Sequence, residues 1–141
     1  MAFYEMSNQP TTESRQIRLE VFVNEQGFEN EFDQYDEVGN AFHFVMFDDN
    51  GLPVATCRMN KEAEGVYHIG RVAVKKDCRK KGYGAKVIAV AEGAATDIGG
   101  KLITIGSQVQ ALGFYLSLGY IKEGEEYIEE GKPHVKVYKI L

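Results

Sequence analysis

The chain has 141 residues, is 44% hydrophobic and 26% charged, and carries a formal net charge of −5 at pH 7. That length suits one domain with a real hydrophobic core, and the composition is ordinary for a soluble globular protein. No run approaches the roughly 20 apolar residues of a bilayer span, and the N-terminus MAFYEMSNQP lacks the pattern of a secretory signal. We therefore expect a single domain spanning residues 1–141, cytoplasmic and without membrane contact.

The first third of the chain predicts a strand, a helix and a loop. AFYEM (2–6) indicates a short strand, and Thr11 or Thr12 is a suitable cap for a helix that continues through IRLEVFV (17–23). The following segment, NEQGFENEFDQYDEVGN, lacks a clean hydrophobic period. It predicts a loop with one helical turn.

Strands dominate the next segment. AFHFVMF (41–47) and LPVATCRM (52–59) flank DDNG, whose residues favour a turn between antiparallel strands. A third run, VYHIGRVAV (66–74), follows Gly65. A helix is then predicted by the 3.6-residue period of Val87, Ile88, Ala91, Ala95 and Ile98, and Gly99 and Gly100 end it.

The C-terminal part adds three strands and a short helix. KLITIG (101–106) predicts a strand, ALGFYLSLG (111–119) a short helix, YIKEGEEYIEE (120–130) a straight or bent strand, and HVKVYKI (134–140) a closing strand. Neither repeats nor low-complexity tracts interrupt the chain. The order of elements indicates one α+β domain.

Cysteine and histidine positions bear on metal chemistry. Cys57 and Cys78 form no CxxC pair, so we expect free thiols in a reducing compartment. The three histidines, His43, His68 and His134, are scattered along the chain, whereas a zinc site needs about four closely spaced ligands. No metal site is expected.

The charges are unevenly distributed. Residues 70–86 hold seven lysines and arginines against Asp77 alone, while residues 20–49 hold nine carboxylates and no lysine or arginine. A nucleic-acid-binding protein usually spreads basic side chains over a wide face in order to follow many phosphates. One small anion pocket in acidic surroundings therefore predicts no nucleic-acid partner.

The basic segment contains RKKGYG (79–84), an RxxGxG pattern between a predicted strand and a predicted helix. Glycines leave room for a ligand at the backbone, and the N–H groups of a helix start attract phosphate. The pattern is neither a Walker loop nor a Rossmann fingerprint. A basic helix cap, or a small nucleotide- or phosphosugar-binding protein, remains an alternative.

Together with the VAV strand before it and FYLSLGY (114–120) about thirty residues later, this pattern resembles the GNAT superfamily of acetyl-CoA-dependent N-acetyltransferases. VFVNEQ (21–26), AFHFV (41–45) and GKPH (131–134) resemble its small ElaA-like branch. The resemblance implies a central mixed, mostly antiparallel sheet flanked by helices. It also implies a transferase that binds coenzyme A, in a family whose members commonly form homodimers.

The resemblance implies a set of residues that bind acetyl-CoA. The backbone of Val72, Ala73 and Val74 would pair with the pantetheine amides. Gln108 lies close to where many relatives carry an asparagine that contacts the pantetheine arm. The pyrophosphate would be held by the loop and the first helical turn, which comprise Arg79, Lys80, Lys81, Gly82, Tyr83, Gly84 and Ala85.

Catalysis requires a proton donor for the departing thiolate and a base for the amine. The resemblance implies that Tyr115 is the donor. For the base, the sequence leaves His43, Glu25, His68, His134 and a water chain open, because a lone strand histidine is often a core residue and Glu25 is compatible with a surface carboxylate.

The acceptor is predicted from charge. Carboxylates in residues 25–37 and 123–130 would raise the local concentration of a cation, which favours a primary amine of a small molecule or peptide. The alternative function is a non-catalytic acyl-CoA-binding or sensing module. Such a module would bind acetyl-CoA without transferring the acetyl group.

Overall fold

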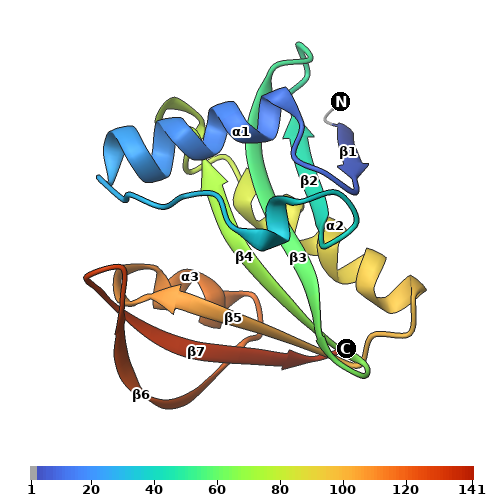
Figure 1. Cartoon of the computed structure of the whole chain (residues 1–141), viewed down its shortest axis with the longest axis vertical. Coiled ribbons are helices and arrows are strands. Elements are labelled where there is room, and N and C mark those ends of the chain that lie inside the picture. The colour runs from blue at the N-terminus through green and yellow to red at the C-terminus, as the bar shows by residue number, and fades with distance from the viewer. Residues whose placement is uncertain (1–2) are drawn as a thin grey trace.

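A seven-stranded sheet runs through the computed structural model, which describes residues 3–141. The spatial order is β1-β2-β3-β4-β5-β7-β6, and only the β4–β5 pair is parallel. The predicted mixed, mostly antiparallel sheet is thus confirmed (Figure 1). The strands are β1 Phe3–Ser7, β2 Phe42–Phe47, β3 Pro53–Ala63, β4 Val66–Val74, β5 Leu102–Gln108, β6 Ile121–Glu129 and β7 Lys132–Ile140.

Three α-helices accompany the sheet: α1 Thr12–Arg18, α2 Tyr83–Asp97 and α3 Leu112–Ser117. Thr11 caps α1, since its hydroxyl accepts from the Ser14 N–H while the Ser14 hydroxyl accepts from the Thr11 N–H. The helix does not stop at Arg18. It widens into a π-helical segment, η1, over Leu19–Glu25, a rare conformation that is frequent at functional sites.

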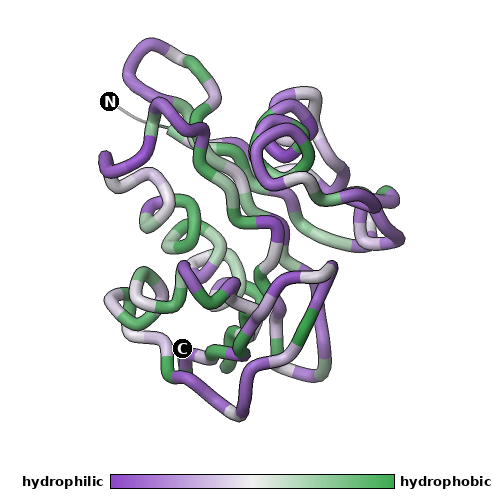
Figure 2. Tube along the Cα trace, turned by 90° about the vertical axis from the view of Figure 1, so that its left-hand side faces the viewer, coloured by the Kyte–Doolittle hydropathy of each residue, from purple (hydrophilic) through white to green (hydrophobic). Residues whose placement is uncertain are grey.

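Apolar side chains pack on both faces of the sheet. Ile17, Val21 and Phe22 of α1 and η1 cover one face, against Val45 and Phe47 of β2. On the other face, α2 contributes Val87, Ile88, Ala91 and Ala95 to a larger core with β2, β3, β4 and β5. Figure 2 shows α1 end-on, with the hydrophobic strands between it and α2.

The predicted elements agree with the structure, with local corrections. Ala2 of the first predicted strand lies outside the described residues. Ile98 was predicted to belong to the apolar face of the long helix, but it is 49% exposed at the C-cap of α2, where the backbone has left helical geometry. In the β2–β3 turn, the Asp48 carboxylate accepts from the backbone N–H groups of Asn50 and Leu52. No helix among residues 3–141 is long and apolar enough to cross a membrane.

The two parallel strands at the centre of the sheet separate part of the way along. β4 and β5 pair from Val66↔Leu102 to Ile69↔Ile105, and beyond that point the two strands no longer pair with each other (Figure 1). The β3–β4 register also shifts there, and Arg71 has a positive φ of 51°. This bulge bends β4 away from β5. The separation leaves one backbone edge of β4 without a neighbouring strand.

Candidate functional site

A cleft of about 1260 Å³ occupies the gap between the separated strands. The C-terminal half of β4, the start of α2 and the Phe114–Tyr115 pair of α3 form one end. The other end is bounded by β3, the β6–β7 hairpin and the segment that follows η1. Most of the predicted cofactor residues line this cleft, namely Val72, Ala73, Val74, Arg79, Lys80, Gly82, Tyr83, Gly84, Ala85 and Gln108, whereas Lys81 does not.

The backbone at the start of α2 has the geometry of an anion cradle. Gly82 is the N-cap residue, with a φ of 84°, and a Cβ added there would meet no atom within 4 Å. Lys80 also has a positive φ, of 64°. The first-turn N–H groups of a helix have no intrahelical partners, and the helix dipole favours negative charge beside them. The site therefore fits the diphosphate of a nucleotide cosubstrate.

Gly84 has a second role, in packing. It is buried, and a Cβ at this position would lie 3.2 Å from Phe114 Cζ and 3.4 Å from Val74 Cγ2. Glycine here lets the first turn of α2 approach both β4 and α3. The sequence analysis expects the glycines of this loop to leave room for a ligand, and these two contacts are a further reason why a larger residue would be poorly tolerated at Gly84.

Arg79 connects the loop that precedes α2 with the end of η1. Its two terminal nitrogens lie 2.6 and 2.7 Å from the Glu25 carboxylate oxygens, and its Nε donates to the Val74 carbonyl. The hydrogen bonds from Arg79 hold the pKa of the Glu25 carboxyl below its usual range. Glu25 does not line the cleft. This ion pair argues against Glu25 as the base, because a carboxylate so stabilised is a poor proton acceptor.

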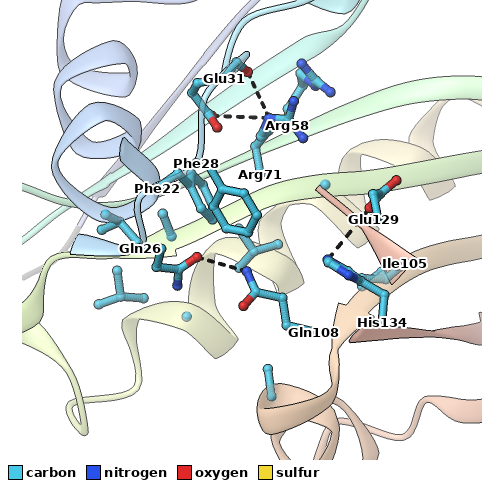
Figure 3. Close-up of a pocket in the computed structure, with 18 of the residues that line it drawn as sticks. Phe22, Gln26, Phe28, Glu31, Arg58, Arg71, Ile105, Gln108, Glu129 and His134 are labelled. Atoms are coloured by element: carbon cyan, nitrogen blue, oxygen red, sulfur yellow. Dashed lines mark hydrogen bonds and ion pairs between the residues drawn. The ribbon is translucent and has the colours of Figure 1, made fainter. Parts of the chain in front are cut away.

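A glutamine pair spans the cleft above β4. Gln108 Nε2, on β5, donates to Gln26 Oε1, which lies just beyond η1, at 2.9 Å (Figure 3). Phe22 and Phe28 line the same side, with ring centroids 6.3 Å apart. The sequence analysis named Gln108 but gave no role to Gln26, Phe22 or Phe28 in the site. Nothing in the sequence shows that Gln26 meets a residue 82 positions later.

Tyr115 lies at the cofactor end of the cleft. It is only 6% exposed, and its ring contacts Phe114 and Tyr120 edge-on, with centroid separations of 5.1 and 6.0 Å. Burial, with a small contribution from nearby Cys57, raises the pKa of the phenol above its usual value. The hydroxyl is therefore protonated at neutral pH, which is the state that a proton donor requires.

Ion pairs build the wall opposite β5. Arg18, 1% exposed, donates to Glu31 at 2.8 Å and to both carboxylate oxygens of Asp36 at 2.7 and 3.0 Å. Arg58 contacts Asp33 and Asp36, and the Arg71 Nε lies 3.2 Å from a Glu31 carboxylate oxygen (Figure 3). Burial opposes ionisation of Asp36, but hydrogen bonds from Arg18 outweigh it and hold the pKa of that carboxyl well below its usual range.

This wall corrects the interpretation of the acidic segment. Charge counting predicted that the carboxylates of residues 25–37 attract a cationic acceptor. Glu25, Glu31, Asp33 and Asp36 are instead matched with arginines that are distant in sequence. At the end of the cleft bounded by β3 and the β6–β7 hairpin, the predicted acceptor end, negative charge comes from carboxylates without an arginine partner among residues 3–141. Those that line the cleft are Glu29, Glu62, Glu129 and Glu130.

His134 lies at that acceptor end. Its Nδ1 lies 2.9 Å from the Lys132 carbonyl, so this nitrogen carries the proton, and Nε2 lies 3.7 Å from a Glu129 oxygen (Figure 3). The Tyr127 ring stacks on the imidazole, with centroids 5.9 Å apart. His134 is therefore held in one orientation, with Nε2 next to a carboxylate.

His43, the first histidine named as a candidate base, lies elsewhere. It is 2% exposed on β2, does not line the cleft, and its Nε2 has no hydrogen-bond partner among residues 3–141. Burial is the main reason that the pKa of His43 falls to about 4, and Arg18 and Arg58 add to the effect. A buried imidazole outside the cleft has no access to an acceptor amine, so its position does not support the role of base.

The buried state of His43 predicts acid-sensitive stability. A histidine with a folded pKa of about 4 and an unfolded pKa near 6.5 binds its proton first in the unfolded chain, so stability is lost as pH falls from about 6.5 to 4. The full contribution is about 3 kcal/mol. Urea unfolding at several pH values in this range should show that the free energy of unfolding falls more steeply with decreasing pH for the wild type than for His43→Gln. An equal pH dependence in the two proteins would contradict the buried, neutral state of His43.

Comparisons with known proteins agree with this geometry. A family model described as an acetyltransferase (GNAT) domain matches residues 8–141. A Bacillus subtilis (strain 168) protein, provisionally named an acetyltransferase, is 35% identical over 130 residues, which cover 88% of this chain and 85% of that protein.

Solved structures share the whole fold. Escherichia coli ElaA is 26% identical, with a TM-score of 0.84 and 99% of each chain covered. A Bacillus subtilis acetyltransferase, solved in complex with CoA, is 19% identical, with a TM-score of 0.71, and the match covers 100% of this chain and 99% of that one. The separated strands, the glycine-rich helix start and the family match together lead to one conclusion: the chain belongs to the GNAT acetyltransferase family.

Proposed function

We propose that the protein is an N-acetyltransferase that moves the acetyl group of acetyl-CoA to a primary amine of a small molecule or peptide, by direct attack in a ternary complex. The observation that carries this proposal is the continuity of the cleft. It runs from the start of α2, past the unpaired edge of β4 and Tyr115, to an end lined by carboxylates and histidines. The CoA complex of the structurally similar Bacillus subtilis enzyme supports an acyl-CoA cosubstrate.

Each part of the cleft has a task in this reaction. The Gly82–Gly84 turn would hold the pyrophosphate, and the free edge of Val72–Val74 would pair with the pantetheine amides. Acetyl-CoA supplies an activated thioester. A β4 backbone N–H would donate to the thioester oxygen, a type of contact whose loss typically costs about 2.7–4 kcal/mol. Tyr115 would protonate the departing sulfur.

The charge at the acceptor end supports a cationic or polyamine-like acceptor. Glu129 and Glu130 belong to the exposed β6–β7 hairpin, and Glu29 follows η1. A focused negative potential raises the local concentration of an amine that carries further positive groups. Diamines, amino sugars and peptides with a free lysine or N-terminus therefore form the first test set.

The test is a thiol-release assay with acetyl-CoA across that amine library. We expect turnover that is fastest with acceptors carrying a second positive charge and that falls as ionic strength rises. Binding of acetyl-CoA by calorimetry, without thiol release from any amine, would instead establish the non-catalytic binding module. An affinity for ADP equal to the affinity for CoA would favour a nucleotide-binding protein.

A further inference from the structure

His68 lies on β4, in the part that still pairs with β5. It lines the cleft, and its side chain is 34% exposed. A Cβ on Gly70 would lie 3.6 Å from His68 Nε2, so this nitrogen projects over a residue that has no side chain to cover it. Among residues 3–141, Nε2 makes neither a hydrogen bond nor an ion pair. The nitrogen is therefore open to a ligand in the cleft.

The other imidazole nitrogen is held by a short relay. His68 Nδ1 lies 2.9 Å from the Thr104 hydroxyl oxygen on β5 and 3.5 Å from a Glu62 carboxylate oxygen on β3, and the Thr104 hydroxyl lies 3.3 and 3.4 Å from the two Glu62 oxygens. A carboxylate only accepts, so the Thr104 hydroxyl donates its hydrogen to Glu62 and accepts from His68. Nδ1 must then carry the imidazole proton. Nε2 keeps the lone pair.

We propose that His68 is the general base for the acceptor amine and that Thr104 and Glu62 are positioning residues, which fix the Nδ1–H tautomer and aim Nε2 into the cleft. This inference rests on the proposed N-acetyltransferase function. Nε2 takes a proton from the amine nitrogen as the new C–N bond forms. Tyr115 gives its phenolic proton to sulfur as the C–S bond breaks, and solvent returns the proton from His68 to Tyr115.

The electrostatic surroundings keep His68 neutral. Burial, the largest effect, lowers the pKa of His68, and Arg58 and Lys136 act in the same direction, while Glu62 and Glu129 oppose them. A neutral imidazole at pH 7 is able to accept a proton. His134 also lines the cleft, but a Glu129 carboxylate oxygen lies 3.7 Å from its Nε2, whereas the Nε2 of His68 has no such neighbour among residues 3–141. His43 lies outside the cleft.

The tautomer is tested first, on the free protein. The chain has three histidines, so two-dimensional nitrogen–proton NMR, with His43→Gln and His134→Gln for assignment, resolves each ring. We expect His68 as the Nδ1–H tautomer at pH 7.5. We also expect this preference to be weakened in Thr104→Val, where only the Glu62 carboxylate 3.5 Å from Nδ1 still favours it, and kept in Thr104→Ser. An Nε2–H tautomer in the wild type would overturn the relay, whatever the acceptor proves to be.

Catalysis is tested with the best amine from the library. His68→Gln should lower kcat by about 10²-fold or more, the usual contribution of a positioned base, with unchanged CoA affinity. Thr104→Val should lower kcat about tenfold, and Thr104→Ser should restore it. Thr96→Val, which removes a hydroxyl bonded within α2, serves as the matched control.

Wild-type kcat in His68→Gln would remove His68 from the reaction. Equal losses in Thr104→Val and Thr104→Ser would reduce Thr104 to a packing role and overturn the relay. Absence of turnover in the wild type would defeat the enzyme proposal and the role of base with it. The tautomer measurement would still decide whether Thr104 and Glu62 hold the imidazole.

Discussion

Replacement of Gly82 by valine is expected to weaken CoA binding by about 100-fold or more. Gly82 has a φ of 84°, a region that β-branched residues avoid, so valine would turn the loop and redirect the N–H groups at the start of α2. Loss of two hydrogen bonds to a charged group costs about 1.5–3 kcal/mol each, and 1.4 kcal/mol corresponds to a tenfold change in affinity. Calorimetric titration with CoA measures the change.

Gly99→Val provides a matched control at the opposite end of the same helix. Gly99 also has a positive φ, of 88°, and a Cβ there would meet no atom within 4 Å. In both variants the free energy of unfolding should fall by a similar amount, about 1–2 kcal/mol, but only Gly82→Val should bind CoA more weakly. Equal CoA affinities in the two variants would show that the helix start is not the phosphate cradle. Gly84 is a less suitable probe, because a side chain there would also crowd Phe114.

Replacement of Tyr115 by phenylalanine is expected to lower kcat by about 10²-fold or more, with little change in acetyl-CoA affinity. The substitution removes a protonated hydroxyl at the cofactor end of the cleft and keeps the ring that packs against Phe114 and Tyr120. Stopped-flow thiol release separates the acyl-transfer step from cosubstrate binding. A rate equal to that of the wild type would exclude the phenol as the proton donor.

The neighbouring tyrosine is the control for that experiment. Tyr120 is 3% exposed, and its hydroxyl donates to Glu92 at 2.7 Å, on the core side of α2. Tyr120→Phe should reduce the stability of the fold by about 1.5–3 kcal/mol, because a hydrogen bond to a carboxylate is lost, while kcat stays unchanged. The two substitutions remove the same atom from adjacent buried rings, so they separate catalysis from packing.

The candidate site joins local features with long-range ones. The helix start at Gly82 is local, because positive φ and free N–H groups follow from a few consecutive residues. The relay from Glu62 through Thr104 to His68 joins three strands and includes a contact between residues 42 positions apart. In the sequence, Thr104 is one polar residue in an apolar strand. Only the β4–β5 pairing places it opposite His68.

The strands, the long helix and the glycine turn at its start could be predicted from the sequence, since hydrophobic period, turn residues and glycine positions act over short distances. The folded structure was needed to show which charges remain unpaired and which histidines, His68 and His134, line the cleft. The acidic segment 25–37 shows this most clearly, because its carboxylates meet Arg18, Arg58, Arg71 and Arg79 only after the sheet has formed. Ion pairing and burial depend on neighbours in space, and chain order does not specify these neighbours.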